Sequence, residues 1–136
     1  MKVAFATEDM IHVNAHFGWA KTIAVYEVTA EDAFRVEVFK FGGVLEEDGN
    51  EDKLLLKIDA ITDCAILYVS AIGGSGAARV VNRNIHPVRV PETETIAKLI
   101  EKLQAVLGGT PPPWLRKAIH KGKERDFNFD DEVLHG

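Results

Sequence analysis

The sequence predicts an α/β protein in which a mixed five-stranded sheet lies between two helical layers. Three observations support this class: an alternating, strand-like pair of segments near the N-terminus, a continuous apolar run at residues 65–69, and amphipathic helices that alternate with strands in the second half. The chain of 136 residues is long enough to bury a core without a disulfide or a metal. We expect one domain over residues 1–110, followed over residues 111–136 by a Pro-rich segment, a short helix and a loose tail.

The first half of the chain predicts three strands. Residues 2–7 form a short apolar run that we expect to be buried on both faces. Residues 21–29 are rich in β-branched and aromatic side chains, which favour strands. Residues 33–41 alternate strictly, with Phe34 and Val36 on one face, as expected for a partly wet antiparallel partner. The last two strands therefore predict an N-terminal antiparallel hairpin.

The second half predicts helices and strands in alternation. Residues 53–62 carry apolar side chains at helical spacing, including Leu54, Leu55 and Ile58. Residues 65–69 are typical of a central parallel strand, and residues 92–107 form the clearest amphipathic helix. A short helix over 77–84 and an edge strand over 85–90 lie between them. Right-handed crossovers would place these helices on both faces of the sheet.

Composition excludes several classes of protein. The net charge of −5 argues against a nucleic-acid partner bound by bulk electrostatics. The single cysteine, Cys64, excludes an internal disulfide and an all-cysteine metal site within one chain. No apolar run approaches the roughly 20 residues of a membrane helix. We therefore expect a cytoplasmic protein with neither a nucleic acid nor a membrane as its partner.

Topology predicts the position of a functional site. If the strands at 2–7 and 65–69 are parallel neighbours, their carboxyl ends share one edge of the sheet, where open α/β sheets bind ligands. The irregular segment 8–18 and the turn 70–76 both leave that edge. Cys64 stands at the other end of its strand, roughly 20 Å away at about 3.3 Å per residue. Histidine is therefore favoured over cysteine as the reactive side chain.

The glycine-rich turn offers backbone amides that can bind an anion. It follows a strand and opens a helix, so its N–H groups and the helix dipole act together, and Arg79, expected near the first turn, adds charge. The turn is neither a Walker A loop nor a GxGxxG fingerprint, and a plain strand-to-helix connection explains it equally well. The residues concerned are Gly73, Gly74, Ser75 and Gly76.

Two histidines with an asparagine between them are the candidate side-chain ligands at the same edge. Imidazole is a common ligand for iron and zinc. His16 is the favoured ligand of the two, whereas His12 fits better as a surface histidine without a ligand role. Asn14 lies between them, and only Glu8 and Asp9 add carboxylates nearby, so the segment does not form a complete metal site.

Five segments form a specific combination: 13–20 (VNAHFGWA), 72–74 (IGG), 77–82 (AARVVN), 85–88 (IHPV) and 111–118 (PPPWLRKA). Together they resemble the NifX/VnfX group of dinitrogenase iron–molybdenum cofactor biosynthesis proteins, which is related to NafY and to the C-terminal part of NifB. The resemblance covers about residues 1–120. The first two segments mark the wider family, and the Pro-Pro-Pro-Trp-Leu run points to the NifX type.

This resemblance implies a ribonuclease H-like fold without nuclease activity. It also implies a carrier that binds the iron–molybdenum cofactor of nitrogenase, or its iron–sulfur precursor, and passes it to cofactor assembly proteins, with apo-dinitrogenase as a further candidate partner. A histidine ligand is expected in the family, and His16 is the matching residue. We expect secondary contacts from His12, Asn14 and Arg79, and hydrogen bonds from the amides of 73–76. Such a site holds its cargo less firmly than several cysteine thiolates would, which suits a carrier.

Two alternatives remain open at this point. The chain is a protein-interaction module if Trp114, Leu115 and the tail bind assembly partners while the cofactor is held elsewhere. It is a metal-dependent nuclease of ribonuclease H type if Glu8 and Asp9 hold divalent cations, although no third and fourth carboxylate is convincingly placed to complete that site.

Overall fold

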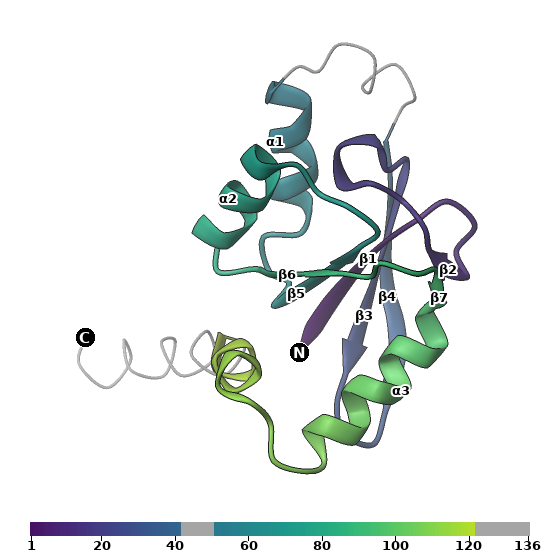
Figure 1. The fold of residues 1–136 in the computed structure, drawn as a ribbon, viewed down its shortest axis with the longest axis vertical. Coiled ribbons are helices and arrows are strands. Elements are labelled where there is room, and N and C mark those ends of the chain that lie inside the picture. The colour runs from purple at the N-terminus through teal and green to yellow at the C-terminus, as the bar shows by residue number, and fades with distance from the viewer. Residues whose placement is uncertain (42–50, 122–136) are drawn as a thin grey trace, which may run out of the picture.

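The structure is a computed structural model that describes residues 1–41 and 51–121. Its centre is a mixed five-stranded sheet in the order β4-β3-β1-β5-β6, and a second, two-stranded sheet pairs β2 with β7 (Figure 1). The predicted tail at 122–136 lies outside the described residues. The elements are β1 (Lys2–Thr7), β2 (His12–Val13), a 3-10 helix η1 (Phe17–Trp19), β3 (Thr22–Val28), β4 (Ala33–Lys40), α1 (Glu51–Ala60), β5 (Ile66–Val69), α2 (Gly74–Asn82), β6 (His86–Arg89), β7 (Glu94–Thr95) and α3 (Ile96–Leu107).

The central strands form as the apolar runs predict. β1 pairs antiparallel with β3 and parallel with β5, and β6 continues the sheet parallel to β5. All four residues of β5 are buried. A strand with both faces covered needs apolar side chains at every position, which explains the continuous apolar run. The predicted α/β class and the mixed five-stranded sheet are confirmed.

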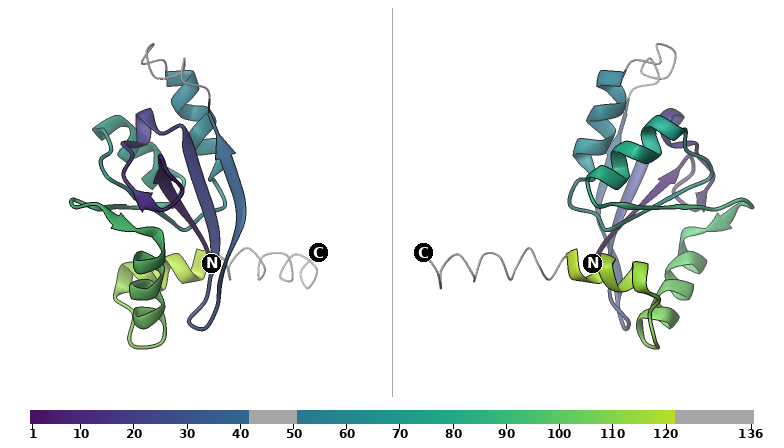
Figure 2. Two further views of the ribbon diagram at one scale, coloured as in Figure 1. Left: turned by 90° about the vertical axis from the view of Figure 1, so that its right-hand side faces the viewer. Right: turned by 60° about the vertical axis from the view of Figure 1, so that its left-hand side comes forward.

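Helices cover both faces of this sheet (Figures 1 and 2). Successive side chains of a strand point to opposite faces, so Val3 of β1 enters one core and Ala4 enters the other. One core contains side chains from α1 and α2, and the other contains side chains from α3 and from the helix of residues 113–121. No helix within residues 1–41 and 51–121 combines the length and the apolar character needed to cross a membrane.

The clearest predicted helix begins later than its sequence suggests. α3 begins at Ile96 rather than Glu92, because Glu94–Thr95 forms the short strand β7 instead. Thr95 then acts as the N-cap, and its Oγ1 accepts a hydrogen bond from Lys98 N at 3.1 Å. The two-residue strands β2 and β7 carry no periodicity, so the sequence gives no sign of them.

The edge strand β4 does not keep the predicted strict alternation. Val25 faces Glu37, whereas the next residue, Tyr26, faces Arg35, so Val36 is an extra residue on β4. Such a bulge disrupts the alternation of faces along a strand. Val36 consequently exposes 40% of its surface.

Candidate functional site

Two loops meet at the carboxyl ends of β1 and β5. Phe17 N donates a hydrogen bond to Ala71 O at 2.9 Å, and Ser70 N donates one to Ala15 O at 3.1 Å. His16 and Ala71 form an isolated parallel bridge between these two bonds. The structure thus brings His16 beside the segment that leads into the glycine run.

His16 is the N-cap of η1, and its ring is fixed by that role. Its Nδ1 accepts a hydrogen bond from Gly18 N at 3.1 Å, and the side chain is half-buried. A Cβ at Gly18 would lie 3.5 Å from both Cε1 and Nδ1, so the ring packs closely over this glycine. Because Nδ1 uses its lone pair in this bond, the neutral ring carries its proton on Nε2. The imidazole therefore presents an N–H donor at Nε2.

A buried lysine holds the turn that carries His16. Lys57 of α1 exposes only 2% of its surface, and its Nζ donates to Phe17 O at 3.2 Å and to Gly18 O at 2.9 Å. The ammonium also lies 5.6 Å from the centroid of the Phe41 ring. Lys57 therefore holds the carbonyl of the peptide group whose N–H bonds to His16, and also the carbonyl of the following peptide group.

The glycine run forms the first turn of α2. The helix begins at Gly74 rather than at the predicted Ala77, and no side chain caps it at Gly73. The first amides of a helix lack partners within the helix, so they remain available to an anion. A Cβ would meet nothing within 4 Å at Gly73 or at Gly74, whereas at Gly76 it would lie 3.6 Å from the Phe17 ring. One end of the run is thus open, and the other packs under η1.

The structure does not place Arg79 where the sequence analysis expects it. Because α2 begins three residues early, Arg79 lies in the last turn of the helix and not in its first. At 1.5 Å per residue it stands roughly 7 Å along the axis from Gly74. Its charge therefore acts on the turn from further away than predicted.

His12 and Asn14 are engaged within their own loop. Asp9 accepts hydrogen bonds from His12 N at 2.7 Å and from Ile11 N at 2.9 Å, and its second oxygen lies 2.6 Å from His12 Nδ1. These bonds, above all the one from the His12 backbone, hold the pKa of Asp9 well below its usual range. Asn14 Oδ1 accepts from Glu8 N at 2.8 Å. The side chains of Asp9, His12 and Asn14 thus stabilise the conformation of this loop.

No group of three His, Cys, Asp or Glu side chains is placed to hold a metal ion among residues 1–41 and 51–121. Cys64 is fully buried just before β5, at the opposite end of the strand from His16. A metal cargo at this edge would therefore meet few protein ligands, and its other contacts would come from backbone amides.

The sequence does not predict the role of one residue of this region and misplaces another. Lys57 stands three residues after Leu54 and four before Ile61, inside the apolar stripe of α1, whereas Leu55, expected in that stripe, exposes 36%. A lysine at such a position is itself a signal that a buried ammonium has a defined partner. Trp19, at the end of η1, is expected from the sequence to pack against the N-terminal hairpin, but it exposes 55% of its surface.

Comparisons with known proteins agree with the resemblance given above. Residues 1–106 match the family model described as "Dinitrogenase iron-molybdenum cofactor". The chain is 59% identical over 133 residues to NifX of Herbaspirillum seropedicae, covering 98% of this chain and 91% of that protein. It is 43% identical over 138 residues to NifX of Sinorhizobium fredii, covering 97% and 86%. The crystal structure of PH0822 has a similar fold, with a TM-score of 0.60, 24% identity, and coverage of 77% of this chain and 89% of that one.

Proposed function

The chain belongs to the dinitrogenase iron-molybdenum cofactor family, and we propose that it is a non-catalytic carrier of the nitrogenase cofactor or of its iron–sulfur precursor. In this role it takes part in assembly of the cofactor and transfers the cluster between assembly proteins, or to apo-dinitrogenase, in the cytoplasm. The family membership supports the cargo class, and the arrangement of His16 and α2 supports the binding site.

The observation that carries the proposal is the backbone bridge between His16 and Ala71. It holds the backbone of His16 beside Ala71, three residues before α2 begins without a side-chain cap. A sulfide-rich metal cluster is anionic, so it matches amide N–H donors and the positive end of a helix dipole. A cluster with an accessible iron matches one imidazole. This neighbourhood supports the proposal of one ligand and one anion site at the same edge of the sheet.

We propose His16 as the metal ligand, with a ring that exchanges partners when the cargo arrives. A histidine that binds iron through Nε2 normally carries its remaining proton on Nδ1. Here Nδ1 faces Gly18 N, itself a donor, so ligation requires the ring to leave this bond and the proton to move to Nδ1 through solvent. The lost bond costs about 1 kcal/mol. The N-cap bond therefore competes with iron and favours release.

Further contacts are proposed from His12, Asn14, Arg79 and the amides of residues 73–76. The helix dipole and the amides would bind sulfides or an attached carboxylate. His12 and Asn14 would act chiefly by shaping the loop, since their side chains bond to Asp9 and to the backbone of Glu8. Arg79 would contribute long-range positive charge.

We also propose that the fold is ribonuclease H-like. The strand order, with an antiparallel β4–β3 pair beside β1 and parallel β5 and β6 on the other side, supports this assignment. Two helices on one face and α3 on the other are consistent with it.

The test is an anaerobic titration of the full chain with isolated cofactor, followed by visible absorption and by protein-bound iron after gel filtration. We expect His16→Ala to weaken binding at least about tenfold, which corresponds to the loss of one ligand. His120→Ala, an exposed histidine of the C-terminal helix, is the matched control and should bind like the wild type.

The results of this titration distinguish the role of His16 from the carrier role of the whole chain. Unchanged affinity in His16→Ala would remove His16 as the ligand while leaving the carrier role intact. No binding by the wild-type protein, tested with both the cofactor and the precursor, would overturn the carrier role itself. Circular dichroism of both variants shows whether the fold is retained.

A further inference from the structure

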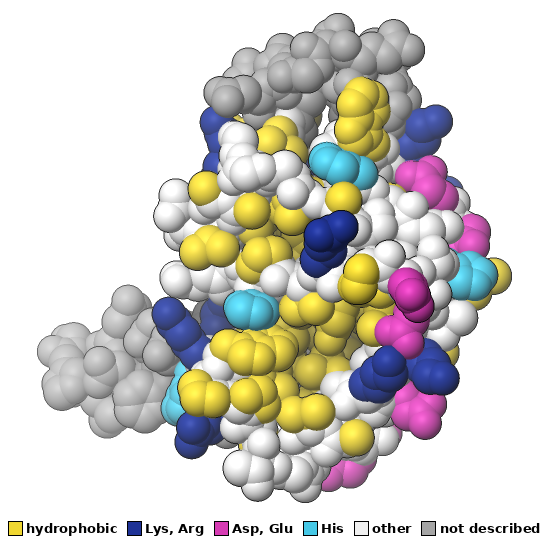
Figure 3. Space-filling view, in the orientation of Figure 1, with side chains coloured by type: hydrophobic (Ala, Val, Ile, Leu, Met, Phe, Trp, Pro, Cys, Tyr) yellow, Lys and Arg dark blue, Asp and Glu magenta, His cyan; other side chains and the backbone are white. Residues whose placement is uncertain are grey.

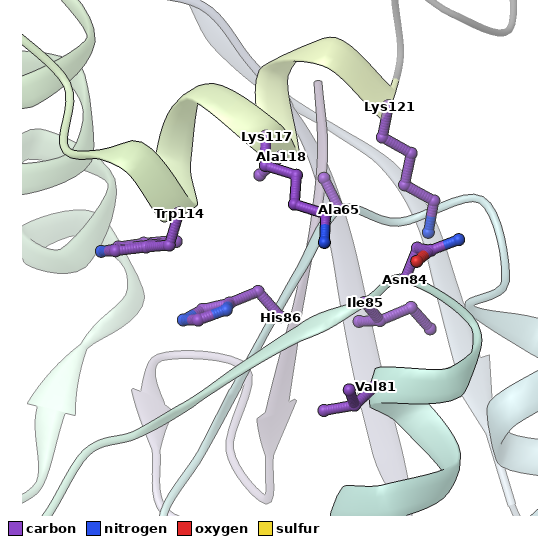
Figure 4. A pocket seen from close by; sticks show the side chains of 9 residues that line it. All are labelled: Ala65, Val81, Asn84, Ile85, His86, Trp114, Lys117, Ala118 and Lys121. Atoms are coloured by element: carbon purple, nitrogen blue, oxygen red, sulfur yellow. The ribbon is translucent and has the colours of Figure 1, made fainter.

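A pocket lies at the edge of the sheet opposite His16. Ala65, which precedes β5, and His86, which opens β6, both line it, so it stands at the amino ends of these parallel strands. Its volume is about 350 Å³, within the usual range for binding pockets. Figure 4 shows its lining, which comes from the residue before β5, from the end of α2 and the start of β6, and from the helix of residues 113–121.

The floor of this pocket is apolar, and the apolar surface continues onto its rim. Ala65, Ile85 and Ala118 are buried, with 3%, 1% and 6% of their surfaces exposed. Val81 and Trp114 are large apolar residues that nevertheless expose 54% and 37%. Figure 3 shows hydrophobic side chains gathered in the lower half of this face, with Lys and Arg at the left margin and a mixture of basic and acidic side chains at the right. A contiguous apolar patch with a polar rim typically marks an interaction site.

A stacked pair of rings forms one wall. The centroids of His86 and Trp114 lie 4.2 Å apart with an angle of 14° between the planes. Burial lowers the pKa of His86, so the imidazole is neutral near pH 7 and the wall is uncharged. A tryptophan held in place by stacking loses little freedom on binding a partner, which is typical of residues that dominate interface energies.

The two charged residues that line the pocket are lysines. Lys121 Nζ donates to Thr62 O at 3.2 Å, to Cys64 O at 2.7 Å and to Arg83 O at 3.0 Å, so its three N–H groups are used within the chain and its charge is fixed at one end of the pocket. Lys117 is exposed and extends from the helix toward the pocket (Figure 4). None of the nine lining residues carries a carboxylate. The surface is therefore complementary to a negatively charged ligand that also has an apolar part.

We infer that this pocket docks an acidic segment of a partner protein, with one bulky apolar side chain of that segment inserted between Trp114 and Val81. The exposed side chains favour a protein segment over a small molecule, because Val81 and Trp114 extend the apolar surface beyond the hollow itself. Lys117 would pair with a carboxylate that flanks the inserted side chain, and the ammonium of Lys121, held by backbone carbonyls, would add positive potential without a direct bond.

The partner in this inference is an assembly partner of the proposed carrier, and in that respect it rests on the proposed function. The two claims are separable by experiment. Docking is measured without any cluster, at the other end of β5 from His16. A failure of docking therefore leaves cargo binding untouched, and a failure of cargo binding leaves the docking measurement intact.

The test uses the full chain with Trp19→Phe, so that Trp114 is its only tryptophan, and a short synthetic peptide with one phenylalanine flanked by aspartates. Two control peptides replace the phenylalanine by alanine, or the aspartates by lysines. We expect the acidic phenylalanine peptide to shift the Trp114 emission saturably, and each control peptide to bind at least about tenfold more weakly.

Protein variants locate the contact. Lys117→Glu should weaken binding of the acidic peptide at least about tenfold, and Val81→Ser should weaken it several-fold. Lys98→Glu, an exposed lysine on α3, is the matched control and should leave the affinity within about twofold. Neither Lys117 nor Val81 is part of the core, so these variants should fold.

Three outcomes would overturn the inference. The first is no binding of the acidic peptide at millimolar concentration. The second is equal loss in Lys117→Glu and Lys98→Glu, which would indicate general attraction to the chain. The third is a shift of Trp114 emission by phenylacetate at the same concentrations as the peptide, which would assign the pocket to a small carboxylate instead.

Discussion

The two ends of β5 carry surfaces built in different ways. At the carboxyl end the groups proposed to bind the cargo are mostly backbone: amides of the first turn of α2, together with one imidazole held by Gly18 and by Lys57. At the amino end they are side chains, namely an aromatic stack, aliphatic residues and two lysines. A surface of backbone amides with a single coordinating side chain suits a charged cargo that must dissociate again, because it forms few strong bonds to that cargo. A surface of apolar side chains suits a partner of defined shape.

The separation of these surfaces has a physical basis. β5 is a fully buried strand between two parallel neighbours, so it keeps the two ends at a fixed distance. A carrier built in this way can hold its cargo and its partner at once. The variants below therefore test whether a change at one end leaves the other end unaltered.

Replacement of the buried lysine should have the largest effect. Lys57→Met keeps most of the side-chain volume but removes the ammonium donor from Gly18 O and from Phe17 O, which retains only the 3.3 Å bond from Ala20 N. Loss of a charged hydrogen-bonding group from a buried site costs about 3 kcal/mol in the free energy of unfolding. Urea denaturation measures this, and Lys98→Met, on an exposed helix face, should change stability by about 0.5 kcal/mol or less.

Lys57→Met also tests whether the two ends of β5 respond independently. We expect the ¹⁵N shift of His16 Nδ1 to move, because its bond to Gly18 N depends on the turn that Lys57 holds. The ring resonances of His86 should stay in place. Movement of both histidines would contradict the separation, and an unmoved His16 would contradict the positioning role of Lys57.

The sequence predicts the sheet better than the sites, for a physical reason. Apolar periodicity reports which face of an element is covered, so residues 2–7 and 65–69 are read correctly as central strands. Features fixed by single contacts leave no periodic signal. The strands β2 and β7 span two residues each, and the start of α3 depends on one threonine hydroxyl. The start of α3 predicted from the sequence, Glu92, therefore lies four residues before the observed start at Ile96.

At the site, the same limit separates topology from chemistry. Because β1 and β5 are parallel neighbours, the segments that follow them, residues 8–18 and 70–76, are expected to lie side by side. The structure shows this contact at His16 and Ala71. The roles of individual side chains do not follow. Leu115, considered above as a partner-binding residue, exposes only 1% and packs in the core, while its neighbour Trp114 remains at the surface. Which of these two neighbours faces the core depends only on how the helix of residues 113–121 is rotated about its axis, and the sequence does not fix that rotation.

Removal of Trp114 should have an intermediate effect, confined to the amino end of β5. Trp114→Ala exposes His86, so the pKa of His86 should rise toward its ordinary value of 6.5. A histidine whose pKa is lowered in the folded state stabilises the protein above its unfolded pKa, and this contribution is lost as the pH falls through the folded value. The wild type should therefore lose more stability than Trp114→Ala between neutral and mildly acidic pH.

Two measurements check this expectation. An NMR titration of the His86 Cε1–H gives the pKa in both proteins, and urea denaturation at neutral and mildly acidic pH gives the change in stability. The ring resonances of His16 at neutral pH serve as the internal control and should coincide in the two proteins. An identical His86 titration in the variant would show that the indole does not shield the imidazole.

Alanine in the glycine run should have the smallest effect, and it tests how the carboxyl end binds anions. Gly74→Ala places its Cβ in open space and restricts the unfolded chain, so stability should rise by about 0.5 kcal/mol. In Gly76→Ala the Cβ lies 3.4 Å from Ile72 Cγ1 and 3.6 Å from Phe17 Cδ2, so crowding offsets this gain and the change in stability should be near zero.

Both variants keep the amide N–H at the substituted position. If the backbone binds the cluster, Gly74→Ala should therefore retain wild-type affinity in the anaerobic titration. A loss of affinity would mean that the cargo lies against the Cα of residue 74, and that the open space there, rather than the amide alone, is what the glycine provides.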